Sequence, residues 1–297
     1  MSSQLKDRYQ RQLQSIYGLE NIEFPDSLFW FCEFVVGLSA AEREDFWSAL
    51  CNVEPVGPIY FLLQLAEGKS LHQILADYQA VHYLDITTDW STWWLDGQYY
   101  DDPPEFLTCL KGEIAGEHWG LLLDDPALGF RGVGMFYNGD GSGISVHESI
   151  LAAISDRFEE VIENYEDDKD NKDGFLAAAQ LWQPRFDRFI IDNELNIDDA
   201  RPVGVESDTG LSIILSDRIS AVENERAVAL LKKGRSLWFW DEDTQEKNRA
   251  RLLQARGLMK TAYEIMDRPK LIAILEKVYE SKLYMVDGTG WKARVDN

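Results

Sequence analysis

The chain has 297 residues, 45% of them hydrophobic and 12% aromatic, which is enough for one large or two ordinary domains and excludes a disordered chain. The formal net charge is −23, and no dense cluster of lysine and arginine offsets it. Direct binding to a nucleic-acid backbone is therefore not expected. A surface this acidic suits either a basic protein partner or simple solubility.

Three cysteines, Cys32, Cys51 and Cys109, are widely spaced in apolar surroundings and include no CxxC pair. Neither a zinc site nor a disulfide framework is indicated, and we expect reduced core residues in a cytoplasmic protein. The first residues lack the apolar segment of a secretory signal. No apolar run approaches the roughly 18 residues of a membrane span, so no membrane contact is expected.

Residues 1–165 predict an α+β domain. Apolar spacing and turn residues predict a mostly antiparallel sheet with flanking helices, because helices come first, strands gather in the middle and a helix closes the domain. The expected helices are 5–17, 25–36, 40–50, 70–83 and 148–165. The expected strands are 90–95, 106–110, 119–123, 131–137 and 144–146, of which 106–110 and 119–123 form a hairpin.

Residues 166–173 are charged and polar throughout, which predicts a linker to an all-helical part at 174–297. Four helices are expected there, at 175–191, 221–240, 243–266 and from 269 onward. Pro184 predicts a break or kink in the first of them. Asp243 and Glu246 resemble a capping box at the start of the third.

Motifs for catalysis are sparse. The two stretches that resemble a calcium loop lack the glutamate at its twelfth position, so no metal site is predicted. We interpret His118 as a structural histidine. The paired carboxylates Asp101/Asp102 and Asp124/Asp125 either act as acid and base, if the two ends of the hairpin meet, or are turn residues that bind backbone donors.

The most specific motif is YYDDPPEF at residues 99–106, which resembles the Tyr-Tyr-Asp-Pro-Pro-Glu-Phe motif of the histone PARylation factor family. Four other stretches are similar to parts of that family, so the resemblance spans nearly the whole chain; they are residues 24–31, 56–58, 118–126 and 234–279, the last with an apolar aromatic cluster at 237–240. The chain is shorter before Ala221 and lacks a basic N-terminal tail, which indicates a bacterial or otherwise divergent relative.

The resemblance implies an accessory factor that binds an ADP-ribosyltransferase and contributes a glutamate to its active site, while NAD is bound by the partner. Without gaps, the family's Asp-Glu pair falls on Glu223 and Asn224, and a shift of one residue places Glu225 at the second position. An amide cannot accept a proton from serine, so Glu225, and after it Glu223, are the candidate bases. Alternatively, both are solvated charges that favour a helix N-terminus.

We assign partner binding to Arg201, Tyr100, Asp101 and Asp102, and expect the aromatic residues of the motif to be mainly structural. The N-terminal half also resembles the SUKH superfamily of immunity proteins. That second resemblance implies a protein-binding module without a catalytic role. Under either interpretation the chain is not expected to be an enzyme on its own.

Overall fold

The structure is a computed structural model, and it describes residues 3–82, 93–95, 102–112, 116–137, 143–166, 174–198, 204–238 and 244–286. Within these ranges, a five-stranded antiparallel sheet follows the order of the chain. Its strands are β1 (Glu54–Pro55), β2 (Phe106–Lys111), β3 (Glu117–Leu122), β4 (Val133–Tyr137) and β5 (Ser145–His147). The predicted α+β class is confirmed.

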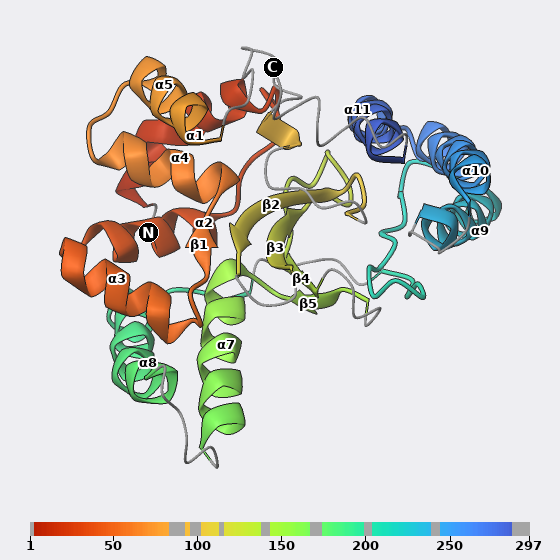
Figure 1. Cartoon of the computed structure of the whole chain (residues 1–297). Coiled ribbons are helices and arrows are strands. Elements are labelled where there is room, and N and C mark those ends of the chain that lie inside the picture. The colour runs from red at the N-terminus through yellow and green to blue at the C-terminus, as the bar shows by residue number, and fades with distance from the viewer. Residues whose placement is uncertain are drawn as a thin grey trace.

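Helices surround the sheet (Figure 1). In the first part they are α1 (Gln4–Ile16), α2 (Asp26–Val36), α3 (Ala40–Ala49), α4 (Gly57–Ala66), α5 (Leu71–His82) and α7 (Ile150–Tyr165). The later helices are α8 (Phe175–Asp192), α9 (Ala221–Trp238), α10 (Gln245–Ile265) and α11 (Pro269–Val286). The described residues after position 220 are helical apart from short connections, as the sequence predicts.

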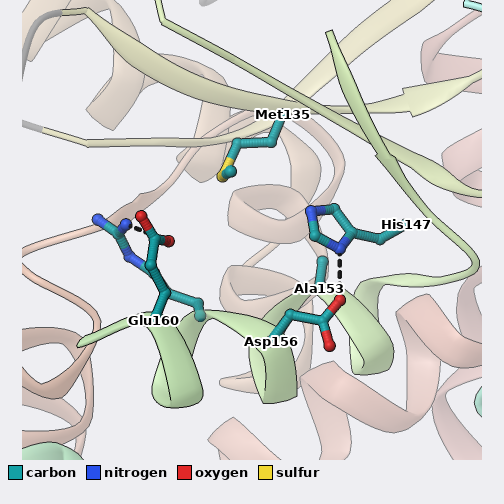
Figure 2. A pocket seen from close by; sticks show the side chains of 6 residues that line it. Met135, His147, Ala153, Asp156 and Glu160 are labelled. Carbon is teal, nitrogen blue, oxygen red and sulfur yellow. Dashed lines mark hydrogen bonds and ion pairs between the residues drawn. The ribbon is translucent and has the colours of Figure 1, made fainter. Parts of the chain in front are cut away.

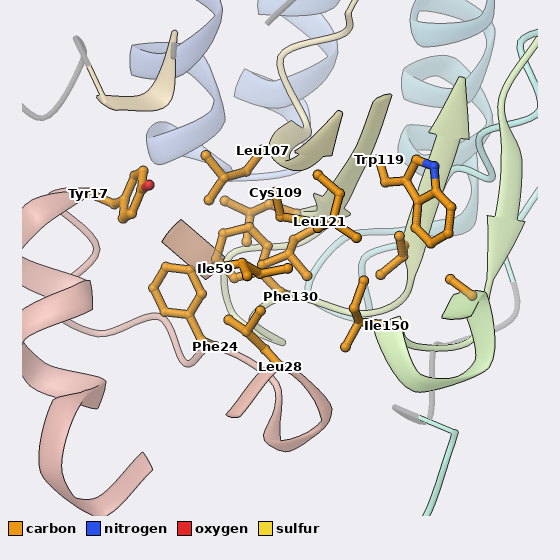
Figure 3. Close-up of a cluster of buried hydrophobic side chains, with 14 of the residues drawn as sticks. Tyr17, Phe24, Leu28, Ile59, Leu107, Cys109, Trp119, Leu121, Phe130 and Ile150 are labelled. Atoms are coloured by element: carbon orange, nitrogen blue, oxygen red, sulfur yellow. The ribbon is translucent and has the colours of Figure 1, made fainter. Parts of the chain in front are cut away.

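The β2–β3 hairpin is the centre of the fold, and both of its faces are buried. Phe106 pairs with Leu122, and alternate residues point to opposite sides. One side carries Leu107, Cys109 and Leu121 into the main core, where they lie among side chains of the N-terminal helices (Figure 3). The opposite side forms a smaller cluster of five buried residues: Phe106, Leu122, Phe136, Ile144 and Leu211.

The turn before α4 fits tightly against β2. Gly57 has φ +49°, and a Cβ atom there would lie 2.3 Å from the carbonyl oxygen of Thr108. The amide of Val56 donates to the carbonyl of Cys109 at 3.1 Å. The glycine therefore has both a conformational and a steric role, since L side chains disfavour this region.

The helix that follows the predicted linker packs on the first part of the chain. α8 lies against α3 and α7. Its Trp182 and Phe186 are buried, and their rings lie 5.5 Å from Phe46 and 5.1 Å from Phe34, respectively, in edge-on geometry. The helical part after residue 204 instead lies on the other side of the sheet (Figure 1).

The C-terminal helices pack in sequence, α9 on α10 and α10 on α11. Four residues at helical spacing form a buried stripe along α10, and Met266 at its C-cap continues the stripe; the four are Leu252, Ala255, Met259 and Ala262. Gly234 lets α9 approach α10 closely, because a Cβ at this position would lie 2.6 Å from the Cγ of Met259.

Several details differ from the sequence predictions, among them β1 and α4, which were not predicted. Trp93 and Trp94, expected in a strand over 90–95, are helical, and both are buried against aromatic rings. Helix α8 continues through Pro184, so the predicted break is absent, and the buried residues on either side of the proline keep the helix packed; a kink there stays a prediction. The N-cap of α10 is Thr244, whose hydroxyl accepts from the amide of Lys247, and not Asp243.

Candidate functional site

The start of α9 holds both candidate glutamates, Glu223 in the first turn and Glu225 in the second. Glu223 is part of a capping box, in which its carboxylate accepts from the amide and hydroxyl of Ser220 at 2.9 and 2.7 Å, while its own amide donates to the hydroxyl. These hydrogen bonds lower the pKa of Glu223 below its ordinary value. Its carboxylate is thus occupied in starting the helix.

Asn224 faces the interior. Its Nδ2 donates to the carbonyl of Ser216 at 2.7 Å, and its Oδ1 accepts from the amide of Ser216 at 2.9 Å. This reciprocal pair fastens the segment before α9 to the helix. Ala227 and Leu231 lie on the same buried face. The ungapped alignment therefore places the family's base at a buried structural amide.

Glu225 is exposed, and among the described residues it has no side-chain hydrogen bond and no ion pair. Two large apolar side chains are exposed nearby in the chain: Val222 is 74% exposed and Leu215, next to the Ser216 that Asn224 binds, is 47% exposed. The second turn of α9 thus presents an uncommitted carboxylate, and Val222 lies three residues before it on the helix.

The other end of α9 is fixed to the hairpin by a buried cluster. Arg235 Nη2 lies 2.8 Å from Glu105 Oε1, and its Nη1 donates to the carbonyl of Leu211 at 3.1 Å. The hydroxyl of Tyr263 on α10 donates to the same carboxylate oxygen. Trp238 Nε1 donates to the carbonyl of Asp102 at 3.0 Å. We call Glu105, Arg235, Tyr263 and Trp238 the anchor.

Glu105 remains the acceptor in this cluster. Burial alone raises the pKa of this carboxyl, but the Arg235 charge and the hydrogen bonds from Tyr263 and Arg235 outweigh burial, so the pKa of Glu105 is lowered. Burial likewise acts to lower the pKa of Arg235, and the negative charge of Glu105 raises it overall. Both groups are therefore charged at neutral pH, and each neutralises the other.

Asp102 was predicted to bind a partner, but it lies inside the protein and not on a surface. It is fully buried, and its carboxylate pairs with Nε2 of His118, while Nδ1 of His118 donates to the carbonyl of Gly116 at 2.7 Å. Burial lowers the pKa of His118, but the charge of Asp102 raises it above the ordinary value overall. His118 is a core residue between the rings of Phe106 and Phe136, as its structural interpretation requires.

The two acidic ends of the hairpin lie together, since the amide of Leu123 donates to the carbonyl of Glu105 at 2.8 Å. Their carboxylates are occupied by different partners. Asp125 accepts from the amide of Ala127 and lies 3.4 Å from Arg268, which also donates to a backbone carbonyl at 2.7 Å. The contact between Asp125 and Arg268 joins the hairpin end to the C-terminal helices. These carboxylates therefore have a structural role and do not form a catalytic pair.

Tyr100, Asp101 and Arg201, the other predicted partner-binding residues, lie outside the described residues, as does most of the predicted linker 166–173. Sequence reasoning missed the anchor. One signal for part of it was present, because Glu105 belongs to the YYDDPPEF motif and an acidic residue before a buried strand needs a partner.

In comparisons with known proteins, no family model and no curated protein matched this chain. The resemblance to histone PARylation factors and to SUKH proteins therefore stays a prediction from the residues quoted above. Among the residues that the structure describes, no helix is long and apolar enough to cross a membrane. In the same ranges, no group of three or more His, Cys, Asp or Glu side chains is arranged to hold a metal ion.

Proposed function

We propose that this protein is an accessory factor of ADP-ribosylation, which binds an ADP-ribosyltransferase and contributes the Glu225 carboxylate to its active site. The observation that carries the proposal is the division of roles among the first five residues of α9. Glu223 caps the helix and Asn224 binds the interior, whereas Glu225 is exposed and uncommitted. A serine hydroxyl is a weak nucleophile, so a carboxylate supplied at this position acts as a general base.

The anchor supports this role by fixing the helix that carries Glu225. A contributed catalytic group must be held to within about 0.5 Å of its working position, and sites on rigid elements meet that requirement best. Arg235 and Trp238 bind α9 to residues 102–105, and Asn224 binds its first turn to Ser216. The YYDDPPEF motif then serves to position α9, through Asp102 and Glu105.

The protein has no cofactor of its own in this proposal, and NAD is bound by the partner. We place the protein in the cytoplasm, in keeping with three buried cysteines in thiol form. The net charge of −23 favours a partner with a basic surface and disfavours nucleic acid.

The alternative is a protein-binding module without a catalytic role, of the SUKH immunity-protein type. The exposure of Val222 and Leu215 favours it, because apolar side chains on a polar surface serve binding whether or not a carboxylate beside them reacts. The two functions differ in what Glu225 does once the partner is bound.

The test compares Glu225→Gln with Glu223→Gln, a matched variant two residues away. Glutamine also serves at the third position of a capping box, so Glu223→Gln preserves the helix start. Each protein is mixed with candidate ADP-ribosyltransferases, NAD and a serine-containing peptide, and both binding and serine modification are measured. Loss of a general base reduces the rate about 10²–10⁴-fold, which we expect for Glu225→Gln alone, with binding retained.

Equal modification by both variants, with binding intact, would refute the catalytic role and favour the binding module. Absence of binding to every transferase tested would refute the accessory role itself.

A further inference from the structure

A small cavity lies between α7 and the strands β4 and β5 (Figure 2), and none of the residues that line it belongs to the anchor. Its volume is about 190 Å³, smaller than the roughly 300–1,000 Å³ of pockets that enclose drug-sized ligands. Six residues line it: Met135, His147, Ala153, Asp156, Arg157 and Glu160. A space of this size suits one side chain or a ligand of similar size.

One face of α7 supplies most of the lining. Ala153, Asp156, Arg157 and Glu160 follow at intervals of three, one and three residues, so they lie on the same side of the helix. Met135 from β4 covers the cavity from the sheet side, and its thioether adapts to the shape of an apolar group. The cavity therefore has an apolar wall opposite a charged helix face.

His147 is held by Asp156. The Nδ1 of His147 lies 2.6 Å from Asp156 Oδ2, and because a carboxylate only accepts, Nδ1 carries the proton and donates it. The second nitrogen, Nε2, is then an acceptor in the neutral ring. It is buried and has no hydrogen-bond partner among the described residues. Because this nitrogen is buried, His147 contributes to the cavity by orienting the Asp156 carboxylate (Figure 2).

Arg157 is the positively charged residue of the lining, and two carboxylates already neutralise it. Arg157 lies 2.9 Å from the buried carboxylate of Glu117 and 2.8 Å from that of Glu160. With the Asp156 carboxylate added, three negative charges face one positive charge, and the formal sum is −2 when the ring of His147 is neutral. An anionic ligand is therefore repelled from this cavity, while a cation is attracted.

We propose that the cavity binds the side chain of a lysine or arginine presented by a protein partner. The aliphatic stem lies on Met135 and Ala153, and the charged group donates to the carboxylates of Asp156 and Glu160. Both side chains combine an apolar stem with a cationic group that carries three or more donors, which matches these acceptors. A basic partner also complements the net charge of −23. This inference does not depend on the proposed function.

The test measures binding through the histidine ring signals in NMR, of which the sequence has only four sets. The probes are Nα-acetyl-lysine methylamide and Nα-acetyl-arginine methylamide, with Nα-acetyl-norleucine methylamide as the uncharged probe of similar shape. His147→Gln assigns the His147 signal. We expect that signal to shift saturably with the cationic probes and not with norleucine, while buried His118 remains unchanged. The two cationic probes also decide between ammonium and guanidinium recognition.

Matched variants on α7 separate recognition of the cation from general attraction to an acidic protein. Glu160→Gln removes a lining carboxylate, and Glu163→Gln makes the same charge change at an exposed position that does not line the cavity. We expect about tenfold weaker binding in Glu160→Gln, the size of a lost hydrogen bond between charged groups, and unchanged binding in Glu163→Gln. Equal weakening in both, equal binding of norleucine, or no shift with either cation would overturn the proposal.

Discussion

Replacing Arg235 by methionine leaves the fully buried carboxylate of Glu105 without its cation. Methionine fills much of the same volume, so the main change is the loss of charge and of the hydrogen bonds to Glu105 and Leu211. Removing one partner of a buried pair costs about 3–5 kcal/mol. Total stabilities are about 5–15 kcal/mol, so we expect a large fall in the urea midpoint at pH 7.

The pH dependence of this loss identifies its cause. In the natural chain the pKa of Glu105 is lowered, so its stabilising contribution is present above the ordinary value of 4.5 and is lost as pH falls through the folded-state pKa. In Arg235→Met, burial dominates and raises the pKa of Glu105 above 4.5. The variant therefore loses stability as pH rises from 4.5 through this raised folded-state pKa. The stability difference between the two proteins should therefore shrink as pH falls from 7 toward 4.5.

Urea unfolding at pH 7, 6 and 5, followed by the fluorescence of the ten tryptophans, measures this difference. The control is the double variant Glu105→Leu/Arg235→Met, which removes both charges. Replacing both members of a buried pair with apolar residues is often neutral, so the double variant should recover most of the lost stability. A double variant no more stable than Arg235→Met, or a difference independent of pH, would refute the reasoning.

Three further outcomes follow from the packing. Gly57→Ala should lose at least about 1–2 kcal/mol in urea unfolding, because its backbone is left-handed and its Cβ would meet the Thr108 carbonyl; an unchanged midpoint would contradict this. Tyr263→Phe should lose about 1.5–3 kcal/mol, the range for a hydrogen bond to a charged group such as Glu105, and a stable variant would rule out that bond. The pKa of His118 measured by NMR should lie above the ordinary value of 6.5. The stability that the natural chain gains over His118→Gln should be complete below pH 6.5 and disappear as pH rises through the folded-state pKa.

The order and type of most elements follow from local patterns. The hairpin at 106–123 is marked by apolar runs between prolines, aspartates and glycines, and the stripe of α10 by helical spacing. The prediction of a strand at Trp93 and Trp94 was wrong. It followed from the preference of aromatic residues for strands, whereas here the two rings pack on Phe61 and Phe130 from a helical turn. Contacts with residues far away in the sequence determine the structure at these two tryptophans, and a local pattern does not contain such contacts.

The candidate site was predictable only in part. The helical spacing of Asn224 with Ala227 and Leu231 already indicates that the asparagine faces inward, which leaves Glu223 and Glu225 on the outside. The pairing of Glu105 with Arg235 joins residues 130 positions apart, and no local pattern carries that information. The same holds for the cavity on α7, where the helix spacing is visible but the approach of Met135 and His147 depends on sheet topology.

The anchor also has a consequence for how the chain is made. Glu105 leaves the ribosome 130 residues before Arg235 and 158 residues before Tyr263. At about 5–20 residues per second, the carboxylate waits about 7–26 s for its cation. During that interval the Glu105 carboxylate lacks the partners that bind it in the folded protein, so the hairpin end is completed only after α9 and α10 have been synthesised.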